Sequence, residues 1–348
     1  MPHKSYRIAV IPGDGISPEA TNIAFEILQH IAKKHNVTYI ERIFPFGGSH
    51  YLTTGELLSQ ESIEELKQYD AIYMGTIGLP KIKPGILEKG ILLNIRLNLD
   101  LYINYRPVKL YPGVDTPIKN KTSSDIDFVV IRENTGGLYT GIGGITMKGT
   151  PDEVAINAKV YNYKQVSRCV RYAFKIAQSR PRKLIALIGK TNILTYVFDL
   201  WERVFNDIGE KEFPEIKREY YHVDTACMHI IKSPEKFDVI VTSNMFGDII
   251  TDIGTVIQGG IGMAARGNLN PEKTTPSMFE PVHGYLPDIT SQNKANPVAA
   301  VMSMKMMLDF LGERNAANDI ENALQKVTPM NIDRLTTKEI AKALVDNL

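Results

Sequence analysis

The sequence has almost no net charge, few cysteines and no long apolar run. Its 40 basic residues nearly balance 39 acidic ones, so the net charge of +1 gives no overall attraction for nucleic acid or an anionic membrane. Cys169 and Cys227 lack the CxxC spacing of zinc or redox sites, which fits a reducing cytosol. No apolar segment approaches the roughly 20 residues that span a bilayer, and the N-terminus lacks an export-signal pattern. We therefore expect a cytoplasmic protein that binds neither nucleic acid nor a membrane.

The chain does contain short apolar runs that alternate with amphipathic segments of helical length. The runs that resemble strands are 6–11, 69–74, 126–131, 183–188 and 237–242, and helical patterns occupy 17–35, 166–179 and 296–312. This alternation predicts an α/β fold with a largely parallel central sheet. A length of 348 residues without a Pro/Ser-rich linker favours two lobes between which the chain crosses more than once.

The segment "IPGDGISPE" (11–19) follows an expected strand and opens an expected helix. Ser17 suits the N-cap of that helix and Pro18 its first turn. Gly13 and Gly15 would let a ligand approach the backbone, but the third glycine of a dinucleotide-binding fingerprint is absent. A plain capped turn is the alternative interpretation.

Three arginines stand near expected strand and helix ends: Arg96, Arg106 and Arg132. A guanidinium fork binds a carboxylate through two hydrogen bonds, so three of them together could grip a di- or tricarboxylic acid. Leu92 and Leu93 precede Arg96 by four and three residues, which on a helix places them on its face. There they would form an apolar patch beside the arginines, or else belong to the core.

Lys190 and Tyr139 are candidates for proton transfer. Lys190 follows an expected strand, and Tyr139 follows a pair of glycines. The proton affinity of either side chain can be tuned in a dry cleft, whereas outside a site they are a solvated amine and a half-buried ring.

The stretch "NMFGDIITDIG" (244–254) places Asp248 and Asp252 one helical turn apart among apolar residues. Two unpaired negative charges are costly in such surroundings unless a cation offsets them. Asp224, in "VDTACM", is a third carboxylate, and three carboxylates without a cysteine or histidine cluster suit Mg²⁺ or Mn²⁺. A solvated helix face is the alternative.

The segment "FEPVHGYLPDITSQNKANP" (279–297) contains His283, Gly284, Asp288 and Asn296 among turn-forming residues. A carboxylate such as that of Asp288 can accept hydrogen bonds from ribose hydroxyls and repels a 2′-phosphate, which favours NAD over NADP. A structural loop with a capping aspartate is the alternative.

Together these segments resemble the isocitrate/isopropylmalate dehydrogenase family of metal-dependent decarboxylating dehydrogenases. The resemblance extends nearly from end to end, through "IPGDGISPE", "GTIGLP", "LLNIRLNLDLYINYRP", "RENTGGLY", "GKTNIL", "VDTACM", "NMFGDIITDIG" and "FEPVHGYLPDI", in that order. It implies oxidation of a β-hydroxy acid by hydride transfer to NAD, followed by loss of CO₂.

The resemblance also implies a role for each candidate. Arg96, Arg106 and Arg132 would bind substrate carboxylates, with Leu92 and Leu93 beside them. Asp224, Asp248 and Asp252 would bind the metal, Lys190 would act as base and Tyr139 as acid. The residues at cofactor-contacting positions are Ile11, Thr76, Asn192, His283, Gly284, Asp288, Ile289 and Asn296.

For the fold, the resemblance implies two α/β lobes that share a large mixed sheet and differ from a true Rossmann domain. One lobe, on the cofactor side, would comprise 1–102 and 258–348, and the other, 103–257, would bind substrate and metal. Family members are homodimers in which the lysine and the first aspartate reach into the neighbouring active site.

The expected substrate is a malate derivative, foremost 3-isopropylmalate. Isocitrate-specific relatives carry a serine and an asparagine where this chain has Gly90 and Leu92, so a polar grip on a third carboxylate is missing. Lys89 stands where isopropylmalate enzymes carry an acidic residue. D-malate or tartrate is therefore the alternative substrate, followed by isocitrate or homoisocitrate, and a non-catalytic regulatory subunit is a further alternative.

Overall fold

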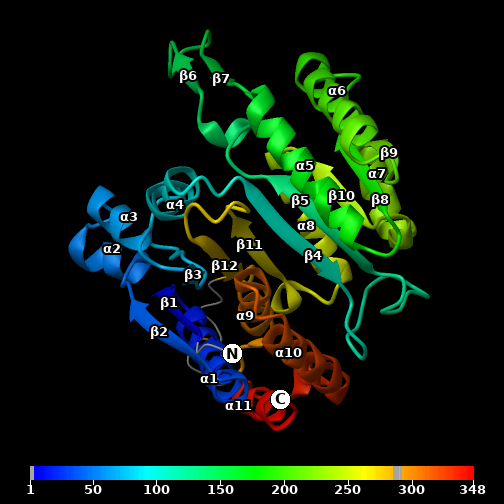
Figure 1. Cartoon of the computed structure of the whole chain (residues 1–348). Coiled ribbons are helices and arrows are strands. Elements are labelled where there is room, and N and C mark those ends of the chain that lie inside the picture. The colour runs from blue at the N-terminus through cyan, green and yellow to red at the C-terminus, as the bar shows by residue number, and fades with distance from the viewer. Residues whose placement is uncertain (1–3, 285–289, 291) are drawn as a thin grey trace. The chain divides into compact units, whose positions relative to one another are not determined.

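A computed structural model of the chain describes residues 4–284, 290 and 292–348 (Figure 1). The chain folds into two compact units. Unit 1 comprises Met1–Leu101, Lys109–Ser124 and Thr255–Leu348, and unit 2 comprises Tyr102–Val108 and Asp125–Gly254. The expected lobes, 1–102 with 258–348 and 103–257, differ from these units chiefly in Lys109–Ser124, which lies with unit 1.

Unit 1 contains five strands of a large mixed sheet in the order β2-β1-β3-β12-β11. Pairing is parallel except between β11 and β12. The strands are β1 (Lys4–Ile11), β2 (Val37–Ile43), β3 (Ala71–Met74), β11 (Ala265–Leu269) and β12 (Ser277–Pro281). β3 and β12 are buried along their whole length, as expected for central strands covered on both faces.

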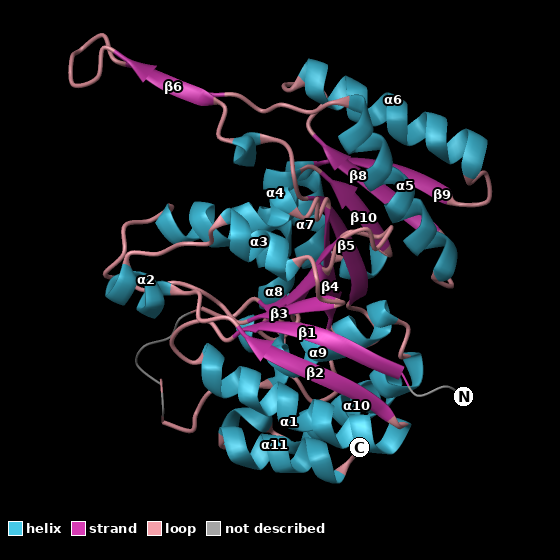
Figure 2. Cartoon of the chain, turned by 60° about the vertical axis from the view of Figure 1, so that its left-hand side comes forward, coloured by secondary structure: helices cyan, strands magenta, loops and turns pink. Residues whose placement is uncertain are grey.

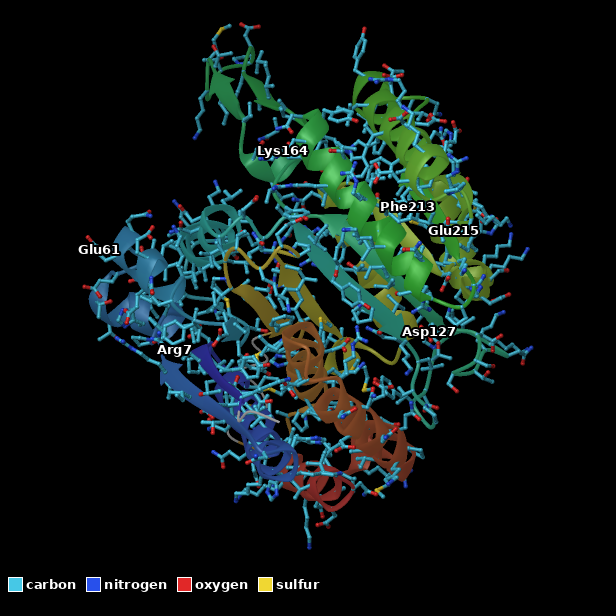
Figure 3. The ribbon with its side chains drawn as sticks, in the orientation of Figure 1. Arg7, Glu61, Asp127, Lys164, Phe213 and Glu215 are labelled. Atoms are coloured by element: carbon cyan, nitrogen blue, oxygen red, sulfur yellow. The ribbon has the colours of Figure 1, made fainter. Side chains whose placement is uncertain are left out.

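Helices surround these strands, and α9 packs on β11, β12 and α1. The helices are α1 (Ser17–His35), α2 (Gly48–Thr54), α3 (Gln60–Leu66), the π-helix η1 (Glu88–Leu93), α4 (Asn94–Asn98), α9 (Val298–Leu311), α10 (Arg314–Val327) and α11 (Thr337–Asp346). Short 3-10 turns are η4 (Ile261–Met263), η6 (Thr328–Met330) and η7 (Ile332–Arg334). Exposed charged side chains such as Glu61 on α3 mark the outer surface (Figure 3).

Unit 2 contains the sheet strands in the order β4-β5-β10-β8-β9, of which β5, β10, β8 and β9 are parallel. They are β4 (Ile103–Lys109), β5 (Asp127–Glu133), β8 (Leu184–Gly189), β9 (Lys217–His222) and β10 (Val239–Thr242). The helices of this unit are α5 (Tyr163–Ser179), α6 (Thr195–Glu212), α7 (Val223–Lys232) and α8 (Asn244–Ile257), whose last turn belongs to unit 1, and the short η2 (Leu138–Thr140) and η3 (Pro234–Lys236).

A separate two-stranded ribbon, β6 (Gly143–Thr146) with β7 (Val154–Asn157), extends away from the rest of unit 2 (Figure 2). Every residue of both strands is exposed. A two-stranded ribbon without a hydrophobic core is only marginally stable alone.

The expected α/β fold with a large mixed sheet is confirmed, and each of the five expected strands and three expected helices is present. Ser17 is not the N-cap of α1, because Ile16 precedes the helix and the Ser17 hydroxyl instead accepts a hydrogen bond from Thr76 N at 3.0 Å. Within the described residues, no helix is long and apolar enough to cross a membrane.

Candidate active site

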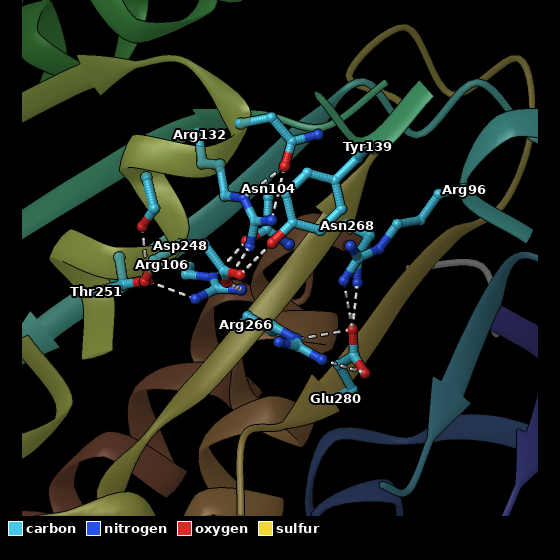
Figure 4. A network of polar contacts seen from close by, with 12 residues as sticks. Arg96, Asn104, Arg106, Arg132, Tyr139, Asp248, Thr251, Arg266, Asn268 and Glu280 are labelled. Carbon is cyan, nitrogen blue, oxygen red and sulfur yellow. Dashed lines mark hydrogen bonds and ion pairs between the residues drawn. The ribbon is translucent and has the colours of Figure 1, made fainter. Parts of the chain in front are cut away.

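Arg106 and Arg132 converge on Asp248 in unit 2 (Figure 4). Arg132 Nη1 donates to Asp248 Oδ1 at 2.5 Å, and Arg106 Nη2 donates to the same oxygen at 3.1 Å. Both arginines are at least 96% buried, whereas about a third of the Asp248 side chain is exposed. The cluster therefore combines two buried positive charges with one accessible negative charge.

The position of these arginines in their strands differs from expectation. Arg106 lies in the middle of β4, and Arg132 is the penultimate residue of β5 and is buried rather than surfacing. Burial of a guanidinium requires acceptors for its N–H groups. Besides Asp248, these acceptors include the neutral oxygens of Asn104 and Thr251 for Arg106 and of Asn244 for Arg132.

Tyr139 joins the same cluster. It lies in η2 after Gly137, whose φ of +76° favours glycine, and its hydroxyl donates to Asp248 Oδ2 at 2.5 Å. Partial burial and the neighbouring Asp248 carboxylate raise the pKa of Tyr139 above its ordinary value, against the opposing effect of Arg132. The phenol is therefore protonated at neutral pH and is a proton donor.

Asp248 and Asp252 project from α8 one turn apart, as the sequence predicted for a helix. Their carboxylate oxygens have the chemistry that Mg²⁺ and Mn²⁺ prefer. Among the described residues, however, no group of three His, Cys, Asp or Glu side chains is arranged to hold a metal ion. Within one chain, then, Asp224 does not join Asp248 and Asp252.

Asp224 pairs instead with Lys190. Lys190 follows β8, Asp224 lies in the first turn of α7, and their Nζ and Oδ1 atoms are 2.8 Å apart. The hydrogen bond from Lys190 lowers the pKa of the Asp224 carboxyl group. Asp224 is well exposed, so this pair is available to a group outside the chain.

In unit 1, Arg96 belongs to a different cluster. It lies in α4, is 3% exposed, and its Nη2 is 3.5 Å from Oε1 of Glu280 in β12. Arg266 and Asn268, both in β11, also contact Glu280 (Figure 4). Burial alone raises the pKa of Glu280, but Arg266 and Arg96 outweigh that effect and hold it at about 2.

Leu92 and Leu93 lie in the π-helix η1, which leads directly into α4. A π-helix has a wider turn than an α-helix, so the spacing of three and four residues does not by itself place them on the face of Arg96. Both are half-buried, and Leu92 packs on the core of unit 1. Their contact with substrate stays a prediction.

Four of the expected cofactor residues lie at the ends of unit 1 elements. Ile11 ends β1 and is fully buried, Thr76 and His283 follow β3 and β12, and Asn296 precedes α9 and accepts from Val298 N at 3.0 Å. The Thr76 hydroxyl donates to the His283 carbonyl at 2.7 Å, which joins the two loops. Burial lowers the pKa of His283 to about 4, so its imidazole is neutral at pH 7.

The remaining expected cofactor residues are placed differently or not described. Gly284 follows His283 and is partly exposed, and Asn192 is exposed in unit 2, two residues after Lys190. Asp288 and Ile289 lie outside the described residues.

The sequence placed Asp14 within the segment 11–16, expected to form one wall of the cofactor cleft, but gave it no role of its own, although it organises the loops there. Its buried carboxylate accepts from Gly48 N at 2.6 Å, Ser49 N at 3.0 Å and Gly78 N at 3.0 Å. Asn104, Asn244 and Glu280 were also missed. Asn244 carried the clearest signal, because it lies two residues after the buried strand β10 and starts α8, and α/β proteins build sites at such positions.

Comparison with known proteins covers nearly the whole chain. The family model described as isocitrate/isopropylmalate dehydrogenase matches residues 7–346. A 3-isopropylmalate dehydrogenase of Thermobifida fusca is 46% identical over 93% of this chain and 91% of its own length. One from Streptomyces avermitilis is 45% identical over 98% of both chains. The crystal structure of isocitrate dehydrogenase from Methylococcus capsulatus has a TM-score of 0.86 and 31% identity, over 98% of this chain and 99% of that one.

Proposed function

The chain belongs to the isocitrate/isopropylmalate dehydrogenase family, and from this premise we propose that it catalyses the NAD-dependent oxidative decarboxylation of 3-isopropylmalate with Mg²⁺ or Mn²⁺. The observation that carries the proposal is the identity of about 45% to 3-isopropylmalate dehydrogenases over more than nine-tenths of the chain. At that level of similarity and coverage, the expected family and the expected enzyme class, a decarboxylating dehydrogenase acting on a CH–OH group, are confirmed.

The surroundings of Gly90 support an alkyl-substituted malate over isocitrate. A Cβ atom added at Gly90 would stand 2.6 Å from Leu57 Cδ1 and 3.1 Å from Leu57 Cγ. A polar side chain at this position would have to displace Leu57, so η1 offers an apolar surface here and no hydroxyl for a third carboxylate. Isocitrate is therefore the disfavoured substrate.

We assign binding of substrate carboxylates to Arg96, Arg106 and Arg132. Arg106 and Arg132 both donate to the carboxylate of Asp248. A guanidinium attracts an anionic substrate, and its planar shape holds a substrate carboxylate in a fixed orientation.

A divalent cation fits the oxygen donors of Asp248 and Asp252, and when bound it would make the substrate hydroxyl more acidic and stabilise the negative charge that develops as CO₂ leaves. Lys190 would accept the hydroxyl proton. Tyr139, whose raised pKa keeps its phenol protonated, would donate a proton to the substrate carbon after decarboxylation.

The cofactor is assigned to the loops of unit 1 that follow β1, β3 and β12. Thr76, His283, Gly284 and Asn296 would contact NAD together with Ile11, and Asp288, Ile289 and Asn192 are assigned to the same cofactor from sequence. The neutral imidazole of His283 suits hydrogen bonding to an adenosine without introducing a charge.

We further propose a homodimer with shared active sites. Ile145, Val154 and Ile156 are exposed on the β6–β7 ribbon, as are Met228 on α7 and Ile249 on α8. Exposed apolar side chains on a ribbon without a core favour burial against a second copy. Asp224, which is exposed, and Lys190, which is bonded to it, would then complete the metal site of the partner.

The proposal is tested by following NADH and NADPH formation from 3-isopropylmalate, D-malate, tartrate, isocitrate and homoisocitrate with Mg²⁺ or Mn²⁺. We expect the highest kcat/KM with 3-isopropylmalate and NAD, and loss of activity in excess EDTA that added Mn²⁺ restores. A higher kcat/KM with D-malate than with 3-isopropylmalate would identify the protein as a D-malate dehydrogenase instead. Turnover of none of these acids would contradict the proposed function.

A further inference from the structure

Asn104 and Asn244 occupy equivalent places beside the two arginines of unit 2. Asn104 precedes Arg106 by two residues on β4, so the two side chains lie on the same face of the strand. Arg106 Nε donates to Asn104 Oδ1. Asn244 begins α8, and its Oδ1 accepts from Arg132 Nε at 3.1 Å and Nη2 at 2.6 Å. Each guanidinium thus donates from one of its edges to a neutral amide oxygen.

Both asparagines are held firmly. Asn104 is completely buried, and Asn244 is 1% exposed. Asn244 Nδ2 donates to the carbonyl of Gly136 at 3.1 Å, and its backbone N–H donates to the Tyr161 hydroxyl at 2.8 Å. These bonds fix the direction of the amide oxygen, and the one to Gly136 also connects it to the loop that carries Tyr139.

A neutral acceptor orients a guanidinium without cancelling its charge. An aspartate at either position would add a negative charge directly against a guanidinium that already donates to Asp248. In a buried site such a charge is screened weakly and competes directly with a substrate carboxylate. Aspartate would be the stronger acceptor, so the choice of asparagine preserves charge at the expense of hydrogen-bond strength.

We propose that Asn104 and Asn244 are positioning residues that orient Arg106 and Arg132 for the substrate without adding a negative charge beside them. This inference rests on the proposed function, because it takes the two arginines as carboxylate-binding groups. It adds a requirement that the positions be polar and uncharged.

The test compares Asn244→Asp with Asn244→Ser in the full-length protein with 3-isopropylmalate, NAD and Mn²⁺. Asn244→Asp keeps an oxygen acceptor for Arg132 but places a negative charge against its guanidinium, so substrate KM should rise about tenfold or more. Asn244→Ser loses the amide acceptor but adds no charge, so KM should rise less. If the residue only supported the fold, the order would be reversed, because serine loses all three side-chain bonds of Asn244 and aspartate loses only the one to Gly136.

Asn270→Asp is the matched control. Asn270 is also buried, accepts from Thr274 N and donates its Nδ2 to a backbone carbonyl, that of Asp100, at 3.4 Å. Its aspartate variant therefore loses one comparable bond away from any arginine, and substrate KM should stay within about twofold of the unaltered protein. NAD KM and melting temperature are measured for all variants.

Asn104→Asp provides an independent test if Asn244→Asp does not fold, because it places the same charge against Arg106. Provided that the unaltered enzyme is active, two results would overturn the inference. One is a folded aspartate variant whose substrate KM stays within twofold of the unaltered value, and the other is a larger substrate KM for Asn244→Ser than for Asn244→Asp. Inactivity of the unaltered enzyme would instead contradict the proposed function.

Discussion

At the scale of single residues, proton affinities in this protein follow burial and the nearest charge. Tyr139 and Asp224 illustrate the two directions: burial and a carboxylate raise the pKa of the phenol, and a lysine lowers that of the carboxyl group. Each shift favours the form that the proposed chemistry needs, a protonated acid and an ionised metal ligand.

Replacing Tyr139 by phenylalanine should lower kcat by a factor on the order of 10²–10⁴, because the proton donor is lost while the ring remains. Steady-state rates with 3-isopropylmalate measure the effect. Tyr163→Phe removes a hydroxyl from a well-exposed tyrosine and should leave kcat unchanged. A Tyr139→Phe enzyme with unaltered kcat would remove Tyr139 from the proton transfer.

The stability of the protein should fall on acidification in two stages. The pKa of His283 is lowered from 6.5 to about 4, so between these values the unfolded chain binds a proton that folded His283 excludes, and stability decreases as pH falls. The pKa of Glu280 is lowered from 4.5 to about 2, so its contribution is complete above 4.5 and is lost as pH falls towards 2.

Urea unfolding between pH 7 and pH 4 measures the first stage, for which we expect a loss of roughly 3 kcal/mol attributable to His283. His283→Gln cannot titrate, so its unfolding free energy should decrease less over the same range. If the unfolding free energy decreased equally with pH in the variant and the unaltered protein, His283 would titrate normally in the folded state.

At the scale of elements, loops that join strands to helices in unit 1 are packed backbone against backbone. A Cβ atom at Gly75 would stand 2.0 Å from the Pro12 carbonyl oxygen, and one at Gly13 would stand 2.4 Å from that of Thr76. Gly13 and Gly75 therefore serve this close approach, and Asp14 then connects the same loops to α2.

Gly75→Ala should destabilise unit 1 by about 1–3 kcal/mol or more, because a backbone carbonyl cannot move aside as a flexible side chain does. Chemical denaturation gives the difference in unfolding free energy. Gly144→Ala is the control, since Gly144 lies on the exposed ribbon with nothing within 4 Å of the added atom. Similar stability of both variants would contradict the close packing of these loops.

At the scale of the whole molecule, one chain does not group Asp224 with Asp248 and Asp252. Assignment of Lys190 and Asp224 to the partner's active site makes a dimer a condition of activity. Cyclic two-fold dimers are the commonest arrangement in which each chain supplies the same residues to the other.

Shared sites predict complementation between two inactive variants. Mixing Lys190→Ala with Asp252→Asn and allowing chains to exchange should restore about a quarter of the original activity, because half of the dimers are mixed and each has one intact site. Activity is followed after dissociation and reassociation, and each variant alone is the control. No recovery despite verified chain exchange would place Lys190 and Asp252 in the site of the same chain.

The sequence by itself determined the elements and the chemistry of the candidates. Apolar periodicity is a local property, and it predicted the strands at 6–11, 126–131 and 237–242 and the helix at 17–35. The ordered motifs predicted the family. The proposed roles of Tyr139, Lys190 and the arginines rest on that same resemblance and await the experiments above.

Only the tertiary structure decided which polar groups meet. Arg132 remains buried inside β5 because Asn244, 112 positions later in the chain, supplies its acceptor, and Glu280 lies against Arg96 across 184 positions. No local pattern specifies such partners, because their distance depends on how strands and helices far apart in the chain are brought together. The same long-range packing decides that Arg106 and Arg132 each meet an amide oxygen as well as the carboxylate of Asp248.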